Sequence, residues 1–137
     1  ATVLGSGDRL DAAIVASEWE GVDVVPAGGE DLADAQQTLV IQKAGRELRL
    51  RRALASVAAR YDLVVLDCPP SLDQLTINAL SAADALVIVT EWKEFRSPDF
   101  DVIKAKLKSP LIFDGRNIFD PALPRQAGLS YLSIGRP

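Results

Sequence analysis

Two residues of the sequence carry side chains suited to binding a nucleotide, namely the carboxylate of Asp67 and the guanidinium of Arg116. Asp67 follows the apolar run 63–66, and the carboxyl ends of buried strands are where α/β folds place ligands. A carboxylate at such a position can orient water on Mg²⁺. Arg116 follows the run 111–113, and its fixed fork of N–H donors suits a phosphate or a uracil ring. We therefore treat both as candidate cofactor-binding residues.

The rest of the sequence lacks the groups that hold a triphosphate. No GxxxxGK[ST] segment occurs, so the lysine and the nest of backbone N–H groups that bind the β- and γ-phosphates are missing. The Gly-Ser-Gly of residues 5–7 has Leu10 where a dinucleotide loop needs its third glycine, which favours an ordinary loop. Acidic residues follow the glycines at 28–29, and their carboxylates repel a phosphate but favour a turn and helix cap.

Histidine is absent from the sequence, which removes the commonest general base, the imidazole zinc ligand and every triad built on histidine. We therefore predict no catalytic residue and no metal site. Asp67 is expected to be a vestigial strand-end residue with no surviving role. No cofactor is expected apart from weak binding of UDP at Arg116.

Composition and charge further narrow the class of protein and its possible partners. The 137 residues are 48% hydrophobic and 25% charged, which is typical of a single globular domain. The net charge of −4 argues against a nucleic-acid or membrane partner, so the basic residues between Lys43 and Arg60 are expected to form a solvated helix face. The single cysteine, Cys68, cannot form an intramolecular disulfide, and no apolar run is long enough to cross a membrane, which favours the cytoplasm.

Short apolar runs predict the strands that would position these side chains. Most runs are continuous rather than alternating, which indicates burial on both faces of a parallel sheet. The expected strands are 22–25, 63–66, 85–89, 111–113 and 131–134. Helical spacing of apolar residues marks 50–58, 72–83 and 100–107, and further helices are expected at 8–17, 31–42 and 121–126. Ser71 with Gln74 fits a capping box, and Ser97 before Pro98 fits a second helix start.

This alternation predicts an α/β fold, with a Rossmann-like or flavodoxin-like sheet of about five parallel strands flanked by helices. Two arrangements remain open. A doubly wound sheet with an order such as 2-1-3-4-5 has three layers, whereas strands in sequential order leave one face bare. The second arrangement has two layers and requires a homodimer that buries the bare face.

Residues 61–72, which read YDLVVLDCPPSL, closely resemble part of the ParA/MinD-type partition ATPases, as do residues 76–80 and 21–27. The likeness covers roughly residues 1–90. It implies that Asp67 corresponds to the aspartate of the Walker B and switch region, near Mg²⁺-ATP. The family's phosphate loop would precede Ala1, and Asp73-Gln74 departs from the family's glycine-containing turn.

Residues 83–96, 112–117 and 131–136 resemble instead the carboxyl-terminal domain of UDP-glucose 6-dehydrogenases. This likeness implies that Arg116 corresponds to an arginine that contacts the UDP-sugar. The dinucleotide domain, the nucleophilic cysteine and the lysine-bearing helix of such enzymes are missing, and Cys68 lies in the other half.

The two resemblances meet near residues 82–89, so we interpret the chain as one α/β domain, 1–137, with a partition-ATPase-like part at 1–82 and a dehydrogenase-like part at 83–137. The expected function is a noncatalytic, engineered or computationally generated chimeric scaffold, not an enzyme. The alternatives are a weak UDP- or UDP-sugar-binding module and a remnant of a P-loop ATPase.

Overall fold

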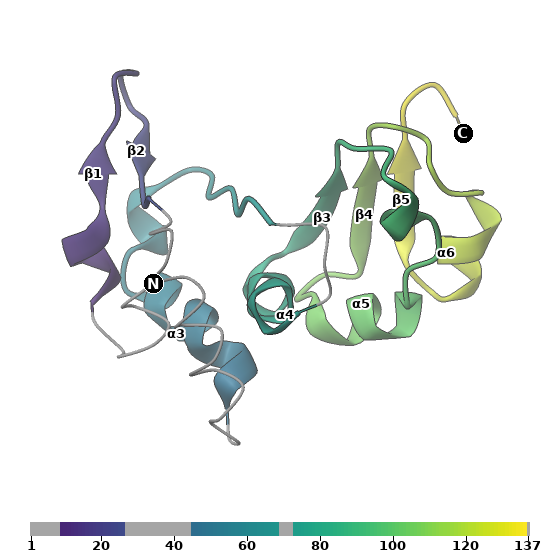
Figure 1. Cartoon of the computed structure of the whole chain (residues 1–137), viewed down its shortest axis with the longest axis horizontal. Coiled ribbons are helices and arrows are strands. Elements are labelled where there is room, and N and C mark those ends of the chain that lie inside the picture. Colours follow the sequence, from purple (N-terminus) through teal and green to yellow (C-terminus); the bar gives the residue numbers. More distant parts are fainter. Residues whose placement is uncertain (1–8, 27–44, 69–72, 137) are drawn as a thin grey trace. The chain divides into compact units, whose positions relative to one another are not determined.

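The computed structural model describes residues 9–26, 45–68 and 73–136. The chain divides into two compact units, Ala1–Val65 and Leu66–Pro137, and each is described by itself (Figure 1). The expectation of one domain with its parts at 1–82 and 83–137 stays a prediction.

The unit formed by Leu66–Pro137 contains a parallel sheet of strands β3 (Ala85–Ile88), β4 (Leu111–Asp114) and β5 (Ser130–Ser133). The strands lie in sequential order, β3-β4-β5 (Figure 1). This confirms the α/β class and the parallel sheet. The expected five strands are not found, because the described residues form three parallel strands and, in the other unit, a short antiparallel pair.

Helices alternate with the strands of this unit, as the sequence predicts. They are α4 (Gln74–Ala82), α5 (Phe100–Lys106) and α6 (Ala122–Gln126), and the turn η4 (Lys93–Arg96) precedes α5. The two predicted caps are wrong, because α4 begins after Asp73 and α5 after Asp99. Each of these carboxylates accepts two N–H groups of the first turn, which a serine hydroxyl does less strongly.

One face of the sheet carries the core of this unit. Ile88, Ile112 and Tyr131 are at most 5% exposed, and α4 and α5 contribute Leu80, Ile103 and Leu107 to the same cluster. Phe119 joins it through an edge-to-face contact with Phe100, whose ring centroid lies 5.1 Å away. This packing fixes the strand ends at which polar side chains gather.

The unit formed by Ala1–Val65 is described at residues 9–26 and 45–65. It contains the turn η1 (Leu10–Ala13), an antiparallel pair of β1 (Val15–Ala16) and β2 (Asp23–Val24), the turns η2 (Arg46–Leu48) and η3 (Ala58–Arg60), and the helix α3 (Arg49–Ala55). Its small core centres on Leu10 and Val57. Arg51 and Arg52 of α3 are exposed, as expected for a solvated helix face, whereas Arg49 of the same helix is half-buried.

The helix expected at 8–17 is wrong. One 3-10 turn forms there, and the chain then extends through β1 because Val15 pairs with Val24 of β2. Ser17 and Val22 close the hairpin through an N–H···O bond of 3.0 Å, and Gly21 supplies a φ of 76° in the turn. The strand expected at 22–25 is therefore the shorter β2, which pairs antiparallel rather than parallel.

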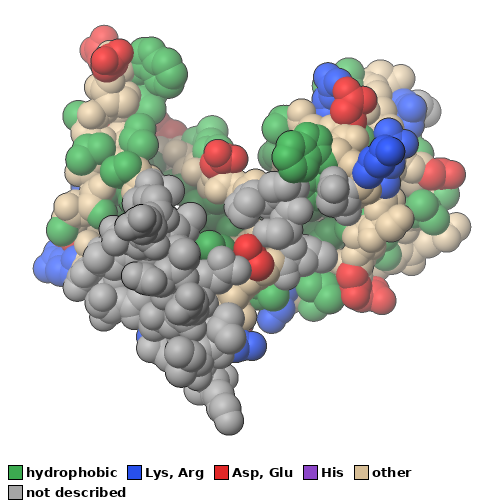
Figure 2. Space-filling view, in the orientation of Figure 1, with side chains coloured by type: hydrophobic (Ala, Val, Ile, Leu, Met, Phe, Trp, Pro, Cys, Tyr) green, Lys and Arg blue, Asp and Glu red, His purple; other side chains and the backbone are tan. Residues whose placement is uncertain are grey.

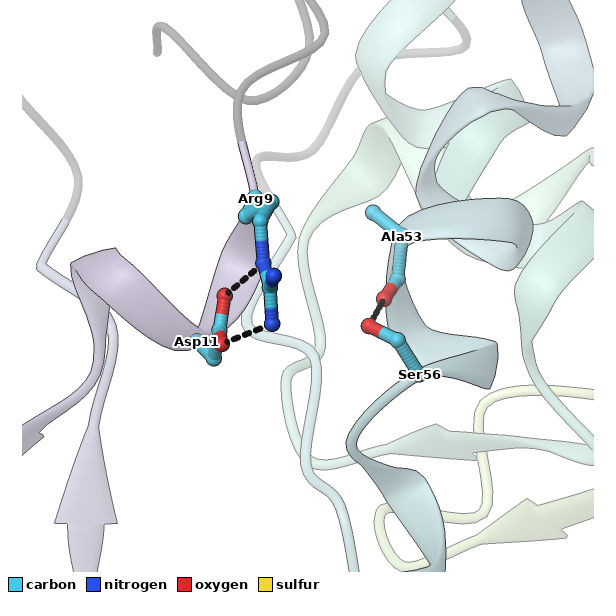
Figure 3. Close-up of polar contacts among 4 residues, drawn as sticks. All are labelled: Arg9, Asp11, Ala53 and Ser56. Atoms are coloured by element: carbon cyan, nitrogen blue, oxygen red, sulfur yellow. Dashed lines mark hydrogen bonds and ion pairs between the residues drawn. The ribbon is translucent and has the colours of Figure 1, made fainter.

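Local polar contacts support η1 and α3 of this unit (Figure 3). Arg9 donates to both carboxylate oxygens of Asp11, with N···O distances of 3.1 and 2.7 Å. Ser56 donates its hydroxyl to the carbonyl of Ala53 at 2.8 Å, near the end of α3. These contacts join residues two or three positions apart, so they shape turns and do not tie distant segments together.

The strand expected at 63–66 is wrong. This stretch is extended but forms no ladder with any strand in the part of the chain that the structure describes. Leu63 and Val65 are 77% and 79% exposed, so its β-branched composition is not matched by burial. A strand requires a hydrogen-bonded neighbour, which composition alone does not reveal. Hydrophobic side chains also reach the surface over β1 and β2 (Figure 2).

Several expectations fall on residues outside the described ranges: the helix at 31–42, the glycines at 5–7 and 28–29, and the hydroxyl of Ser71. Among the described residues, no helix has the length and apolar character that crossing a bilayer requires.

Candidate functional site

Asp114 is the polar centre of the carboxyl end of the sheet. It is the last residue of β4, and only 1% of its surface is exposed. Its Oδ2 accepts the phenolic hydrogen of Tyr131 at 2.6 Å and the N–H of Phe119 at 3.2 Å, while Oδ1 accepts the N–H of Arg116 at 3.0 Å. The carboxylate therefore folds the segment after β4 around itself.

These contacts shift two pKa values in opposite directions. Burial by itself raises the pKa of Asp114, but the hydrogen bonds from Tyr131 and from neighbouring backbone N–H groups outweigh it and leave the pKa below its ordinary value. Burial, followed by the hydrogen bond to the Asp114 carboxylate, raises the pKa of Tyr131 to about 12. The pair is thus held as a carboxylate and a neutral phenol at neutral pH.

The turn after Asp114 is closely packed and leaves little room for a side chain at Gly115. The N–H of Gly115 donates to the carbonyl of Ile88 at 2.9 Å, and a Cβ at Gly115 would lie 3.1 Å from that oxygen. Asn117 adopts a left-handed φ of 56°, and its side-chain amide donates to the carbonyl of Ile134 at 3.0 Å. The turn is therefore fastened to the ends of both neighbouring strands.

Arg116 projects from this turn and forms an ion pair with Glu91, which follows β3. The side chains are 48% and 61% exposed, so solvent reaches both groups. The structure thus places the predicted residue Arg116 where α/β folds bind ligands, but with its guanidinium already engaged by a carboxylate. An anion that binds there must compete with Glu91.

Asp67 occupies a different setting. It is exposed and follows the extended stretch 63–66, and its neighbour Cys68 is an exposed free thiol. Partial burial of the sulfur, with smaller contributions from the carboxylates of Asp67 and Asp73, raises the pKa of the Cys68 thiol. That shift disfavours the thiolate, which is the nucleophilic form of cysteine. Among the described residues, no hydrogen bond or ion pair joins Asp67 to Arg116, so the structure does not bring the two predicted residues together.

The donor set around Asp67 fits Mg²⁺ only as part of a nucleotide complex. Mg²⁺ is usually held by one or two carboxylates together with water and substrate phosphates, and an exposed carboxylate meets that requirement. Within the described residues, no group of three or more histidine, cysteine, aspartate or glutamate side chains could hold a metal ion by itself. Asp67 is thus suited to a metal that arrives with its phosphates.

Sequence reasoning missed Asp114, Tyr131, Asn117 and Glu91. Asp114 could have been found from the sequence, because it is an acidic residue at the end of the apolar run 111–113, directly before Gly115. The tyrosine that completes the pair lies 17 positions away, so local spacing gives no hint of it.

Comparison with models of protein families shows to which family the chain belongs. A family model described as "AAA domain" (AAA_31) matches residues 2–104. The chain belongs to this AAA domain family. The matched region includes Asp67 and ends within α5, so Asp114 and Arg116 lie beyond it.

Relatives of the AAA domain chain are of two kinds. It is 51% identical over 93 residues to the sporulation initiation inhibitor protein Soj of Bacillus subtilis, over 68% of this chain and 36% of Soj. It is 41% identical over 130 residues to a UDP-glucose 6-dehydrogenase of Pseudomonas aeruginosa, over 87% of this chain and 29% of the enzyme. The chain therefore spans about a third of the length of these curated relatives.

A solved structure is also similar to the AAA domain chain. It is the crystal structure of cobyrinic acid a,c-diamide synthase from Mycobacterium smegmatis with a bound ATP analog and magnesium. The TM-score is 0.66 at 30% identity, and the alignment covers 92% of this chain and 55% of the synthase. The resemblances to partition ATPases and to UDP-glucose 6-dehydrogenases are thus confirmed, because proteins of both kinds are among the relatives of the chain.

The prediction of a noncatalytic artificial scaffold is wrong. The AAA domain match, the similarity to Soj and to chromosome partitioning protein ParA of Myxococcus xanthus, and the similarity to the synthase all point to the ParA/MinD-like P-loop ATPases. The prediction relied on the absence of a GxxxxGK[ST] segment from this sequence. The absence of that loop does not show that the remaining residues form a scaffold.

Proposed function

We propose that this chain contributes Asp67 to the Mg²⁺-ATP site of a ParA/MinD-like ATPase. The observation that carries the proposal is that an exposed carboxylate follows an extended apolar stretch inside the region matched as an AAA domain. The similar synthase structure with bound ATP analog and magnesium supports the choice of ligand. The proposal for this chain is limited to holding the complex of Mg²⁺ with its nucleotide.

When bound with its nucleotide, Mg²⁺ would supply positive charge that stabilises phosphoryl transfer. The contribution of Asp67 is to accept hydrogen bonds from water that the ion carries and so to fix the position of the complex. The chain has no GxxxxGK[ST] segment, so we assign the phosphate-binding lysine and its backbone nest to residues outside this sequence. Binding by the chain alone is therefore expected to be weak.

The proposal is tested by titrating the chain with a fluorescent ATP analogue in the presence and absence of Mg²⁺. We expect Mg²⁺ to strengthen binding in the unmodified chain and Asp67→Asn to abolish that gain. Asp62→Asn is the matched control, because Asp62 is an exposed carboxylate directly before the same extended stretch. Binding with no Mg²⁺ dependence, or an unchanged dependence in Asp67→Asn, would contradict the proposal.

A second candidate is binding of a nucleoside diphosphate at Arg116. Its position at the carboxyl end of the sheet and the similarity to a UDP-glucose 6-dehydrogenase support it. Calorimetric titration with UDP should release heat that Arg116→Ala abolishes. Equal heats in both proteins, or none in the unmodified chain, would remove this candidate.

Two ancestries joined near residues 82–89 also remain our proposal. A ParA-type relative that matches 68% of this chain and a UDP-glucose 6-dehydrogenase of Rhizobium meliloti that matches 44% of it support it. It predicts one uninterrupted reading frame in which the coding sequences for the two parts adjoin across these residues. Sequencing single DNA molecules across the junction tests it, since two separate frames would refute the union.

A further inference from the structure

The turn that carries Arg116 is held by one side chain, the carboxylate of Asp114 at the end of β4. Its Oδ1 accepts the N–H of Arg116 at 3.0 Å, and its Oδ2 accepts the N–H of Phe119 at 3.2 Å. The two oxygens of one carboxylate thus bind both the early and the late part of the turn. A segment that is held at two points has few conformations available, so the backbone of Arg116 keeps one position.

Two further hydrogen bonds hold the same turn from its sides. The N–H of Gly115, directly before Arg116, donates to the carbonyl of Ile88 at 2.9 Å. The side-chain amide of Asn117, directly after Arg116, donates to the carbonyl of Ile134 at 3.0 Å. Ile88 is the last residue of β3, and Ile134 directly follows β5. The backbone of Arg116 is therefore fixed relative to both strands that flank β4.

The side chain of Arg116, in contrast, is accessible. It is 48% exposed and pairs with Glu91, whereas only 1% of Asp114 is exposed. A ligand can therefore reach the guanidinium but not the carboxylate, and Asp114 acts on a ligand only through the backbone of Arg116. A guanidinium on a fixed backbone loses less freedom when its fork of N–H groups binds a phosphate, which strengthens the binding.

We propose that Asp114 is a positioning residue for a diphosphate bound at Arg116. This inference rests on the second candidate function, the binding of a nucleoside diphosphate at Arg116, and extends it to a residue that does not touch the ligand. By its charge alone, the carboxylate of Asp114 would repel a phosphate and weaken the binding. Its effect through the backbone has the opposite sign, and fixing the backbone of one residue corresponds to roughly tenfold in a dissociation constant.

Two substitutions of Asp114 separate position from charge, because both remove the same negative charge. Asp114→Ala leaves the N–H of Arg116 without its acceptor. Asp114→Asn keeps an acceptor there when the amide oxygen takes the place of Oδ1 and the amide nitrogen faces Tyr131. The hydroxyl of Tyr131 then rotates to accept from that nitrogen, so the N–H of Phe119 alone loses its acceptor.

The test is calorimetric titration of the full chain and of both variants with UDP. We expect UDP to bind roughly tenfold more weakly to Asp114→Ala than to Asp114→Asn. Amide hydrogen exchange at Arg116, followed by NMR, should be slow in the unmodified chain and in Asp114→Asn, and fast in Asp114→Ala. Ile103→Val is the control for lost stability, because Ile103 is 4% exposed and lies in the core of the same unit. It should leave UDP binding unchanged.

Circular dichroism establishes that each variant is folded. Asp114→Leu replaces Asp114→Ala if that variant does not fold, because leucine fills the space of the carboxylate without providing an acceptor.

Equal UDP affinity of Asp114→Asn and of the variant without an acceptor would overturn the positioning role and leave the site at Arg116 standing. Fast exchange at Arg116 in the unmodified chain would also overturn that role. An unmodified chain that binds no UDP would remove the site itself, and the inference with it. A loss of affinity in Ile103→Val as large as in Asp114→Ala would show that lowered stability is the cause, which again overturns the inference.

Discussion

The phenolic hydroxyl of Tyr131 on β5 donates to Oδ2 of Asp114 on β4 over 2.6 Å, and both residues are almost fully buried. A buried carboxylate is costly unless hydrogen bonds compensate for its lost hydration. Asp114 obtains that compensation from Tyr131 and from N–H groups of the turn that carries Arg116. The stability of this sheet and the position of Arg116 thus depend on the same carboxylate.

Replacing Tyr131 by Phe should lower the free energy of unfolding by about 2 kcal/mol, because a buried carboxylate loses a hydrogen-bond donor. The measurement is urea unfolding followed by fluorescence. The chain has two tryptophans, and a Trp19→Phe background leaves Trp92 to report on the unit formed by Leu66–Pro137.

Tyr61→Phe is the matched control for this prediction. Tyr61 donates to the Asp23 carboxylate at a similar distance of 2.7 Å, but this pair is exposed. Water can replace the lost donor there, so we expect little change in stability. Equal effects of the two substitutions would show that burial of the Asp114 pair does not strengthen its hydrogen bond.

The raised pKa of Tyr131 predicts a loss of stability in alkaline solution. The folded state holds this proton up to a pKa of about 12, whereas an unfolded tyrosine releases it near 10. The folded state therefore binds more protons than the unfolded state within this window, so stability falls as the pH rises from about 10 to 12. Stability curves of the unmodified chain and of Tyr131→Phe should converge over this range, and curves that stay parallel would contradict the assignment.

The elements of Leu66–Pro137 could largely be predicted from the sequence, whereas those of the other unit could not. Helical spacing identifies α4 and α5 because each buries an apolar stripe against one sheet. The run at 63–66 has the same β-branched composition as β3, but a strand also needs a hydrogen-bonded neighbour. Arg116 was found from its position after a strand, while its partner Glu91 was missed because their pairing lies across strands.

Asp73 should be the residue whose removal weakens the start of α4. Its Oδ1 accepts the N–H groups of Leu75 and Thr76 at 2.9 and 3.0 Å, so Asp73→Ala leaves two donors of the first turn without their acceptor. We expect a loss of about 1 kcal/mol in the free energy of unfolding, measured by urea titration. Asp84→Ala is the control, since Asp84 is 79% exposed at the side chain and its ion pair is long. Comparable losses in both variants would argue against a capping role.

Glu91 should limit the affinity of Arg116 for a phosphate group. The ion pair is solvent-exposed, so it contributes at most about 1 kcal/mol, which corresponds to roughly a fivefold change in affinity. If UDP binds at Arg116, Glu91→Gln should strengthen that binding by up to this factor, because the guanidinium no longer has a competing carboxylate. Isothermal titration calorimetry with UDP measures the difference.

Asp84→Asn removes one negative charge from the other end of β3 and therefore controls for the change in net charge. It should leave UDP binding unchanged, because Asp84 pairs with Lys108 and not with Arg116. A similar gain in both variants would indicate long-range electrostatics rather than release of Arg116. If the gain in UDP affinity of Glu91→Gln persists when Arg116→Ala is added, the UDP site lies elsewhere. In that double variant the guanidinium with which Glu91 pairs is absent.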